Sequence, residues 1–268
     1  MTDNTYDQAR LNLPFVGICT FGKYPYVENW DNINADVAVM GAPFDFGSQF
    51  RSGARMGPRG IREASTLFSF GHGGAYDHED DITYLPSDST KIVDIGDADI
   101  IHTDTIKSHA NIKFGVQKIL SANAIPVVIG GDHSINIPCI EAFENEEAIH
   151  IIQIDAHLDF VDERHGVRYG HGNPMRRASE KKHVIEIKVI KPFTDHTIND
   201  VKGGLVSPEN KAWISISSED NWDYIGKSIA KRCRACAIYF CSICSFHLNS
   251  SYCIPLSQHD GQLKQYGK

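Results

Sequence analysis

Hydrophobic residues along this chain gather in short, nearly continuous runs that end at glycine, proline or acidic residues. Runs of this length are typical of strands that are buried on both faces of a sheet. Four such strands are predicted, at residues 35–43, 91–100, 125–134 and 148–157. The last run, AIHIIQIDAH, is too uniformly apolar for a sheet with one face in water.

Between these runs, hydrophobic residues recur at the spacing of a helix. Helices are predicted over 57–70, where Pro58 lies near the start, over 104–120 and over 134–143. The residues at helical spacing are Ile61, Ala64, Ser65 and Phe68 in the first helix, and Ile106, Ile112, Val116, Ile119 and Leu120 in the second. Strands that alternate with helices of this length predict an α/β fold whose parallel sheet is covered on both faces.

Polar residues follow two of the predicted strands. His133 comes after Gly-Gly-Asp at the end of one strand, and Asp155 ends another. In parallel sheets such groups meet beyond the carboxyl ends of the strands. Asp155, His157 and Asp159 also alternate, which places them on one side of an extended segment. Mixed nitrogen and oxygen ligands suit Mn, Fe or Zn better than Ca or Mg. The alternative is a polar loop that ends the strand, with His133 capping the next helix.

Composition narrows the class of protein. The 268 residues carry a formal net charge of -8, which argues against a nucleic-acid-binding surface. The first residues lack the pattern of a signal peptide, and no apolar run approaches the ~20 residues that span a bilayer. The seven cysteines are an odd number, which argues against a disulfide framework. We therefore expect a soluble cytoplasmic protein without a membrane partner.

Several segments resemble signature motifs of the ureohydrolase family, which contains arginases and agmatinases. The clearest are GGDHSI and DAHLDF, and the resemblance covers about residues 14–183. The other matching segments are FVGICTFGKYPYV, GAPFDFGSQFRSGARMGPRGIREAS, IVDIGD and YGHGNPMRRASE. The chain is more similar to agmatinase-like members than to arginases. A deacetylase with a similar metal-bearing fold is disfavoured by the two clearest motifs together.

The resemblance implies a three-layer α/β/α fold with a binuclear manganese centre. It implies that His133 binds one Mn²⁺ and His157 the other, while Asp155 bridges the two ions and Asp159 completes the first site. A hydroxide held between the ions would attack the carbon of a small cationic guanidino substrate, such as agmatine, and release urea and an amine. His171 would pass a proton to the leaving amine. Relatives assemble as trimers or hexamers, so a homo-oligomer is expected.

Two features of the matched region have alternative interpretations. His171 lies between Gly170 and Gly172, so it could instead be a turn residue. The arginines of RSGARMGPRG could bind phosphate or carboxylate, whereas the resemblance favours roles in holding loops and subunit contacts. The resemblance also implies that the loop VDERHGVRYG, between Asp159 and His171, forms one wall of the substrate pocket.

The resemblance ends near residue 183. Family members carry a third motif, SxDxDxxDP, whose aspartates also bind the metals, and no Asp-x-Asp occurs after this point. The acidic runs SSEDNWD and QHDGQ have the wrong spacing and no predicted strand before them. We therefore expect an N-terminal extension at 1–34, a ureohydrolase core at 35–183, and a divergent segment at 184–268 in which the last strands are missing or altered.

Three interpretations of the divergent segment remain open. A frameshift would explain its abrupt change in composition and its many cysteines. Alternatively, two CxxC pairs, at 233–236 and 241–244, could bind a metal with His247, although only four residues separate them. Third, IYFCSIC could be a buried strand. The functional alternatives are a guanidino hydrolase of impaired activity and a non-catalytic remnant that binds metal weakly or associates with intact subunits.

Overall fold

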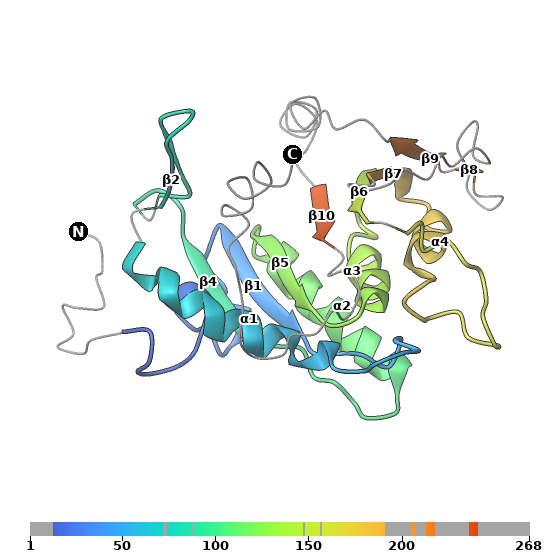
Figure 1. Cartoon of the computed structure of the whole chain (residues 1–268), viewed down its shortest axis with the longest axis horizontal. Helices are drawn as coiled ribbons and strands as arrows, with labels where there is room; N and C mark the ends of the chain where they lie inside the picture. Colours follow the sequence, from blue (N-terminus) through green and yellow to red (C-terminus); the bar gives the residue numbers. More distant parts are fainter. Residues whose placement is uncertain are drawn as a thin grey trace, which may run out of the picture.

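The computed structural model describes residues 13–71, 74–86, 88–146, 148–155 and 157–190, together with the backbone of three short strands further along the chain. Its helices are α1 (Gly57–Ser65), α2 (Thr105–Ser121), α3 (Asn136–Glu141) and α4 (Pro174–Ser179). Its strands are β1 (Val37–Ala42), β2 (Ala75–Asp77), β3 (Ile82–Tyr84), β4 (Ile92–Asp97), β5 (Ile125–Gly130), β6 (Ile149–Ile154), β7 (Val184–Ile190), β8 (Leu205–Val206), β9 (Trp213–Ser217) and β10 (Cys236–Phe240). Figure 1 shows their arrangement.

The strands pair mostly in parallel, as predicted. One sheet has the order β4-β1-β5, and a second has the order β10-β6-β7-β9-β8. Within these two sheets the β8–β9 pair is the antiparallel one, and β2 and β3 form a separate hairpin. The four strands predicted from apolar runs are β1, β4, β5 and β6, so the α/β fold class is confirmed.

The strands after residue 183 correct one expectation about the divergent segment. β7 and β10 pair with the two edges of β6, so β6 does not have the unpaired apolar edge that the loss of later strands would leave. β9 ends at Ser217, so a strand does precede SSEDNWD. The last strands are therefore not all missing, since β7, β8, β9 and β10 follow residue 183. β10 contains AIYF, the linker between the two CxxC pairs. Cys233, Cys241, Cys244 and His247 lie outside the described residues.

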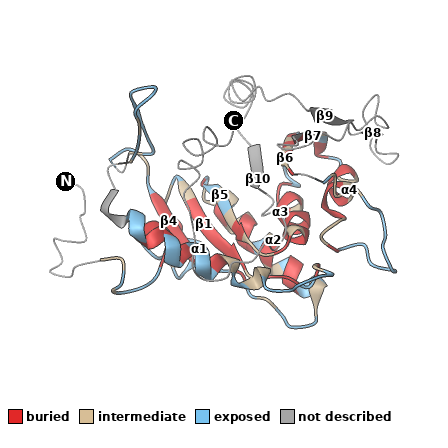
Figure 2. Cartoon of the chain, in the orientation of Figure 1, coloured by how far each residue is buried: buried red, intermediate tan, exposed pale blue. Residues whose placement is uncertain are grey.

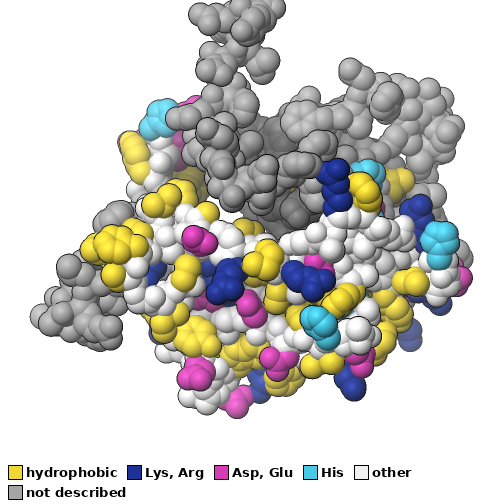
Figure 3. All heavy atoms as spheres, turned by 60° about the horizontal axis from the view of Figure 1, so that its bottom comes forward, with side chains coloured by type: hydrophobic (Ala, Val, Ile, Leu, Met, Phe, Trp, Pro, Cys, Tyr) yellow, Lys and Arg dark blue, Asp and Glu magenta, His cyan; other side chains and the backbone are white. Residues whose placement is uncertain are grey.

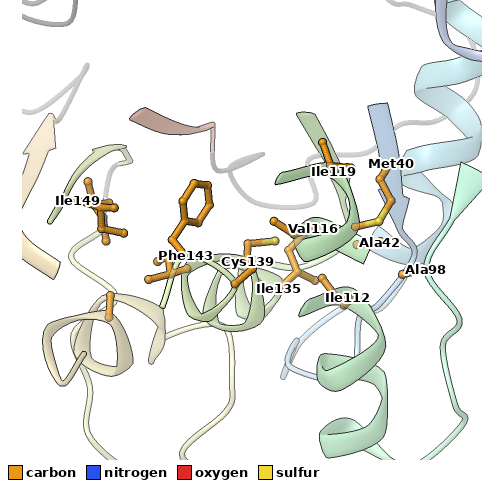
Figure 4. Close-up of a cluster of buried hydrophobic side chains, with 14 of the residues drawn as sticks. Met40, Ala42, Ala98, Ile112, Val116, Ile119, Ile135, Cys139, Phe143 and Ile149 are labelled. Carbon is orange, nitrogen blue, oxygen red and sulfur yellow. The ribbon is translucent and has the colours of Figure 1, made fainter. Parts of the chain in front are cut away.

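Alternate residues of β1 face two different layers. Ala38, Met40 and Ala42 belong to the main hydrophobic core with residues of α2, and Figure 4 shows Met40 and Ala42 beside that helix. Val39 belongs instead to a second cluster, against which Phe21 and Tyr24 pack. Figure 2 shows that the buried residues follow the strands and the helix faces against them. The sheet is thus covered on both sides of β1, which is the three-layer arrangement that was expected.

Helix α2 has the predicted apolar face, with one exception. Ile112, Val116 and Ile119 are fully buried, whereas Ile106 is 60% exposed. The helix begins after Asp104, whose carboxylate accepts a hydrogen bond from the Lys107 N–H at 2.9 Å. This is an ordinary N-cap, which satisfies a donor that the first turn leaves unpaired. Ile106 lies in that first turn, just before the buried face begins.

Helix α1 differs from its prediction. Ile61 is 44% exposed and Phe68, just beyond the helix, is 75% exposed, whereas Pro58, Arg62 and Ser65 form the buried face. Figure 3 shows hydrophobic side chains at the surface, next to charged ones. The helical spacing was correct, but the apolar residues do not face the sheet because an ion-pair cluster occupies that position.

Arg62 is the centre of this cluster. Its guanidinium donates to both carboxylate oxygens of Asp94, at 2.8 and 3.0 Å, and to Asp97 Oδ1 at 2.5 Å. Asp94 is also the acceptor for the N–H of Phe21 at 2.7 Å. The cluster therefore ties α1, the end of β4 and the N-terminal loop together. It requires a glycine on β1, because a Cβ at Gly41 would lie 1.8 Å from Asp97 Oδ1.

Within the part of the chain that the structure describes, no helix has both the length and the hydrophobicity needed to cross a membrane.

A buried histidine lies where α2 meets two loops. His109 is 6% exposed, and its ring packs edge-to-face on Phe44 at 5.1 Å and on Tyr169 at 6.1 Å. Its Nε2 has no hydrogen-bond partner among the described residues. Burial lowers the pKa of His109 to about 4, although the charge of Glu141 opposes this shift. The imidazole is therefore neutral in the folded protein at neutral pH.

We predict that replacing Arg62 with methionine destabilises the fold by about 3–5 kcal/mol, because it leaves the buried Asp94 carboxylate without its cation. Chemical denaturation measures this loss. Arg59→Met, at an exposed position of the same helix, is the matched control and should change the free energy of unfolding by less than about 0.5 kcal/mol. Equal effects of the two substitutions would show that the ion-pair cluster does not hold α1.

We predict that His109 makes the fold less stable in acid. In the unfolded chain an ordinary histidine binds a proton below about pH 6.5, whereas folded His109 stays neutral until about pH 4. Stability is therefore lost as the pH falls through this window, by about 3 kcal/mol in total. His109→Phe should remove this part of the pH dependence, measured by denaturation from pH 7.5 to 4. Identical pH dependence in both proteins would contradict the assignment.

Candidate metal centre

The turn after β5 brings two loops together. Gly131 has a φ of 72°, and a Cβ there would lie 2.4 Å from the carbonyl oxygen of Ala42 and 2.7 Å from that of Phe44. A glycine is required at this position because of both the backbone conformation and the close approach. The N–H of Asp132, the next residue, donates to the carbonyl of Phe44 at 2.8 Å. The segments that follow β1 and β5 are thus in direct contact.

Asp132 fixes the start of the next short helix, the 3₁₀ turn His133–Ile135. Its Oδ1 accepts hydrogen bonds from the N–H of Ser134 at 2.8 Å and from the Ser134 hydroxyl at 2.5 Å. Its Oδ2 accepts from the N–H of Gly47 at 2.8 Å. Burial raises the pKa of Asp132, and the hydrogen bonds from Ser134 and Gly47 act against that rise. Asp132 therefore caps the turn that presents His133.

His133 meets two aspartates that follow β6. Its Nδ1 lies 2.5 Å from Asp159 Oδ2 and 3.7 Å from Asp155 Oδ2, and its side chain is 4% exposed. Ligand atoms of these three residues all lie within 4.8 Å of one another. The prediction that two strand ends deliver His133 and Asp155 to the same place is confirmed, and Asp159 joins them.

Asp155 is fully buried, and its two carboxylate oxygens have different neighbours. Oδ2 is the oxygen nearer to His133, and it accepts a hydrogen bond from Gln153 Nε2 at 3.0 Å. Oδ1 accepts from the backbone N–H of His157 at 2.8 Å and lies 3.5 Å from His157 Nδ1. The carboxylate of Asp155 is thus between the two imidazoles, with one oxygen toward each.

The segment after β6 is not extended, which corrects the period-two interpretation. β6 ends at Ile154, and Asp159 has a φ of 46°, in the left-handed region. This turn directs the Asp159 carboxylate at His133. The His157 side chain is 63% exposed and lies outside the three-residue group, although it remains close to Asp155. Asp155, His157 and Asp159 therefore do not share one side of a strand.

The donor set fits a cation. Among the described residues, the ion-pair partners of Asp155 are His133 and His157, and no lysine or arginine pairs with it. An ionised carboxylate this deeply buried is costly unless an opposite charge is nearby. Two carboxylates and one imidazole are also a donor set that suits a divalent ion such as Mn²⁺, Fe²⁺ or Zn²⁺. A metal held by His133, Asp155 and Asp159 would supply that missing charge.

His171 is held by the loop that follows β1. Its ring Nδ1 lies 2.6 Å from the carbonyl oxygen of Gly47, and its backbone N–H donates to the same oxygen at 3.2 Å. It is partly buried and does not belong to the group around His133. His171 is therefore not one of the three converging residues. Gly47 nevertheless links it to Asp132, the neighbour of His133.

The loop that contains VDERHGVRYG is closed at its base by Asn173. The Asn173 side chain donates to the carbonyl of Val161 at 2.6 Å and accepts from the N–H of Gly170 at 2.8 Å. Arg177 also pairs with Asp162. Residues 161–169, between these anchors, are exposed. The two ends of the loop, one at Asp159 and the other at His171, are thereby held in fixed positions.

Arg55, within RSGARMGPRG, holds a loop in place. Arg55 pairs with the buried Asp45 at 2.6 Å and stacks over Phe46 at 5.1 Å. Burial alone would raise the pKa of Asp45, but hydrogen bonds from Arg55 and from the N–H of Gly53 lower it below its usual range. For Arg55, the role in holding a loop is thus observed.

Gln153 is a site residue that the sequence interpretation missed. It is fully buried in β6, and its amide contacts both Asp155 Oδ2 and, at 3.3 Å, the carbonyl of His157. It therefore orients the carboxylate that lies between the two imidazoles. A signal was available, because a glutamine inside the apolar run IHIIQI is unusual, and a buried amide needs a specific partner.

The comparisons with known proteins agree with this geometry. The model of the family described as "Arginase family" matches residues 35–224, which begins with the predicted core and extends beyond residue 183. The chain is 33% identical over 172 residues to a guanidinobutyrase of Pseudomonas aeruginosa, covering 62% of this chain and 51% of that protein. It is 31% identical over 170 residues to a mitochondrial agmatinase of Gallus gallus, covering 62% and 46%.

Solved structures show the same fold. The proclavaminate amidino hydrolase of Streptomyces clavuligerus superimposes with a TM-score of 0.61 at 26% identity, covering 80% of this chain and 66% of that one. The chain spans about half the length of the two relatives described above. The matched range includes β1, the turn at His133, the Asp155 segment and β7. On this evidence of motifs, fold and sequence similarity, the chain belongs to the arginase family.

Proposed function

We propose that this chain hydrolyses a C–N bond of a small guanidino compound and releases urea and an amine. One observation carries the proposal: the fully buried Asp155 carboxylate directs one oxygen at His133, which also meets Asp159, and the other at His157. The arrangement supports two adjacent cation sites that share Asp155. The relatives whose names include guanidinobutyrase and agmatinase support the substrate class.

We propose manganese as the metal. His133 and Asp159 would hold one ion, His157 the other, and Asp155 both. When bound, the ions would supply a water molecule of lowered pKa as the nucleophile and would stabilise developing negative charge. The exposed position of the His157 ring makes its half of the centre the more open one.

The chain's own residues would carry the proton. Water adds to the guanidino carbon, the bond from that carbon to the substituted nitrogen breaks, and the leaving nitrogen must gain a proton to depart as an amine. His171 is the proposed donor. Asp155 and Gln153 would meanwhile keep the ligand geometry fixed, since Gln153 holds the carboxylate oxygen nearer to His133. The loop at 161–169 is proposed to form one wall of the substrate site.

A specific observation favours a second candidate function. The chain spans about half the length of the guanidinobutyrase it matches, and the Asp-x-Asp of the third family motif is absent from its sequence after residue 183. The ligands that converge within the described residues are those of one ion. A non-catalytic member that binds one cation, or associates with intact subunits, fits these facts.

Other features of the proposal rest on sequence alone. The choice between agmatine and a guanidino acid, a homo-oligomeric assembly and a cytoplasmic location stay predictions. So do the domain limits at 34/35 and 183/184, and the origin of residues 184–268.

We predict that Mn²⁺ stabilises the folded protein through the group around His133. At 100 times the dissociation constant, the ion should raise the free energy of unfolding by about 2.7 kcal/mol. Asp159→Asn should remove most of this gain, as measured by thermal unfolding with Mn²⁺ and with a chelator. Glu163→Gln, an exposed acidic residue of the same loop, is the control and should keep it. Full stabilisation of the Asp159 variant would contradict the assigned ligands.

We predict urea release from agmatine or 4-guanidinobutyrate in the presence of Mn²⁺, and its loss in Asp155→Ala, because this carboxylate is shared by both proposed ions. The same preparations should be assayed for bound metal. Two ions per chain with urea release support the hydrolase. One ion per chain without urea release supports the non-catalytic member, and urea release that survives Asp155→Ala would refute the mechanism.

A further inference from the structure

Gly47 connects Asp132 to His171, although the three residues are distant in sequence. The carboxylate of Asp132 accepts the N–H of Gly47 at 2.8 Å. The carbonyl of Gly47 then lies 2.6 Å from His171 Nδ1 and 3.2 Å from the His171 backbone nitrogen. One fixed peptide segment therefore holds both the ring and the backbone of His171.

The contact fixes which nitrogen of the His171 ring carries a proton. A backbone carbonyl can only accept a hydrogen bond, so Nδ1 must be the donor in this pair. In the neutral imidazole, Nε2 is then the nitrogen with the free lone pair. In the imidazolium both nitrogens carry protons, and the Nδ1–H to Gly47 bond is unchanged. The ring can therefore gain and lose its proton at Nε2 alone.

Gly47 can serve this purpose because it has no side chain. A Cβ at this position would lie 2.7 Å from Ser134 Oγ and 2.8 Å from Asp132 Oδ1. These distances are too short for a carbon atom, so any larger residue would push the loop away from Asp132. The close approach of the Gly47 backbone is what allows its N–H to reach the carboxylate.

We propose that Asp132 is a positioning residue for His171, which acts through the backbone of Gly47 to hold the imidazole as the Nδ1–H tautomer with Nε2 free for proton transfer. The role of His171 in proton transfer rests on the proposed function, whereas the tautomer of its ring does not. Asp132 adjoins the metal ligand His133 in sequence, so one residue would align the proton donor with the metal centre. The arrangement is comparable to the buried groups that orient a catalytic histidine in other hydrolases.

Asp132→Asn tests the link with little change of shape. The carboxylate serves Ser134 through one oxygen and Gly47 through the other. An asparagine has one oxygen, which can keep the two donors of Ser134, and its NH₂ group then faces the Gly47 N–H. Two donors face each other, so the loop with Gly47 loses its anchor. Gly47→Ala should break the same link from the other side.

Nitrogen-15 NMR of the His171 ring reads the tautomer without any need for activity. The signals are assigned by their loss in His171→Gln. In the wild-type protein at a pH where the ring is neutral, Nδ1 should be protonated and Nε2 unprotonated. In Asp132→Asn the signals should shift toward a mixture of the two tautomers. A protonated Nε2 in the neutral wild-type ring, or an unchanged Nδ1–H form in Asp132→Asn, would overturn the proposal.

Kinetics provide the second readout. Asp132→Asn and Gly47→Ala should lower kcat for urea release by about 10- to 100-fold, the usual size of an effect on groups that orient a ligand or a catalytic side chain, with KM nearly unchanged. Gly60→Ala is the matched control, because a Cβ there meets nothing within 4 Å, and it should leave kcat unchanged. If Gly47→Ala does not fold, Asp132→Asn carries the test.

Mn²⁺ affinity separates this role from damage to the metal centre. The affinity for Mn²⁺ should stay within about threefold of the wild type in Asp132→Asn, because His133, Asp155 and Asp159 are intact. A parallel loss of Mn²⁺ affinity and kcat would show that the effect passes through His133, and would overturn the positioning role. If the wild-type chain releases no urea, the proposed function fails, and the NMR result alone decides whether Asp132 holds His171.

Discussion

The burial of the Asp155 carboxylate is the constraint on which the site depends. A charge inside a protein must be matched by hydrogen-bond donors and by an opposite charge, because no water is available to solvate it. The backbone of His157 and the amide of Gln153 supply two donors. The opposite charge would come from a bound cation. The other proposed ligands all approach this one carboxylate.

The loops after β1, β5 and β6 bring the other side chains to this carboxylate, and each loop is held by a few hydrogen bonds. Gly131 allows the turn after β5 to touch the loop after β1, and Gly47 on that loop approaches Asp132 without a side chain between them. The segment after β6 turns at Asp159, whose carbonyl accepts a hydrogen bond from the N–H of Met175 in α4. Each loop is therefore fixed by hydrogen bonds to another segment of the chain. A rigid set of ligands results, although none of these segments is a regular helix or strand over its whole length.

The sequence predicted the strands well and the loops poorly, for a physical reason. Strands buried in a parallel sheet need continuous apolar runs, so β1, β4, β5 and β6 were visible in the pattern. The buried face of α1 was not, because Arg62 is stabilised there by two aspartates that are remote in sequence. The alternation of Asp155, His157 and Asp159 suggested a strand, but the backbone at Asp159 adopts a left-handed conformation that no periodicity reveals. Gln153 was overlooked although it interrupts an apolar run, because its contact with Asp155 forms only in the folded chain.

The strands beyond residue 183 explain how a chain that matches about half the length of its relatives can keep this geometry. Asp155 follows directly from β6, so its position is only as well defined as the strand itself. β6 is paired on one edge with β7 and on the other with β10, in a register that places Phe240 opposite Ile154. Both pairings run to the last residue of the strand. Hydrogen bonding on both edges fixes the point where β6 ends, and thereby where Asp155 begins. The proposed metal ligands on this segment therefore depend on the neighbouring strands for the position of their backbone, whatever the sequence of the loops that follow those strands.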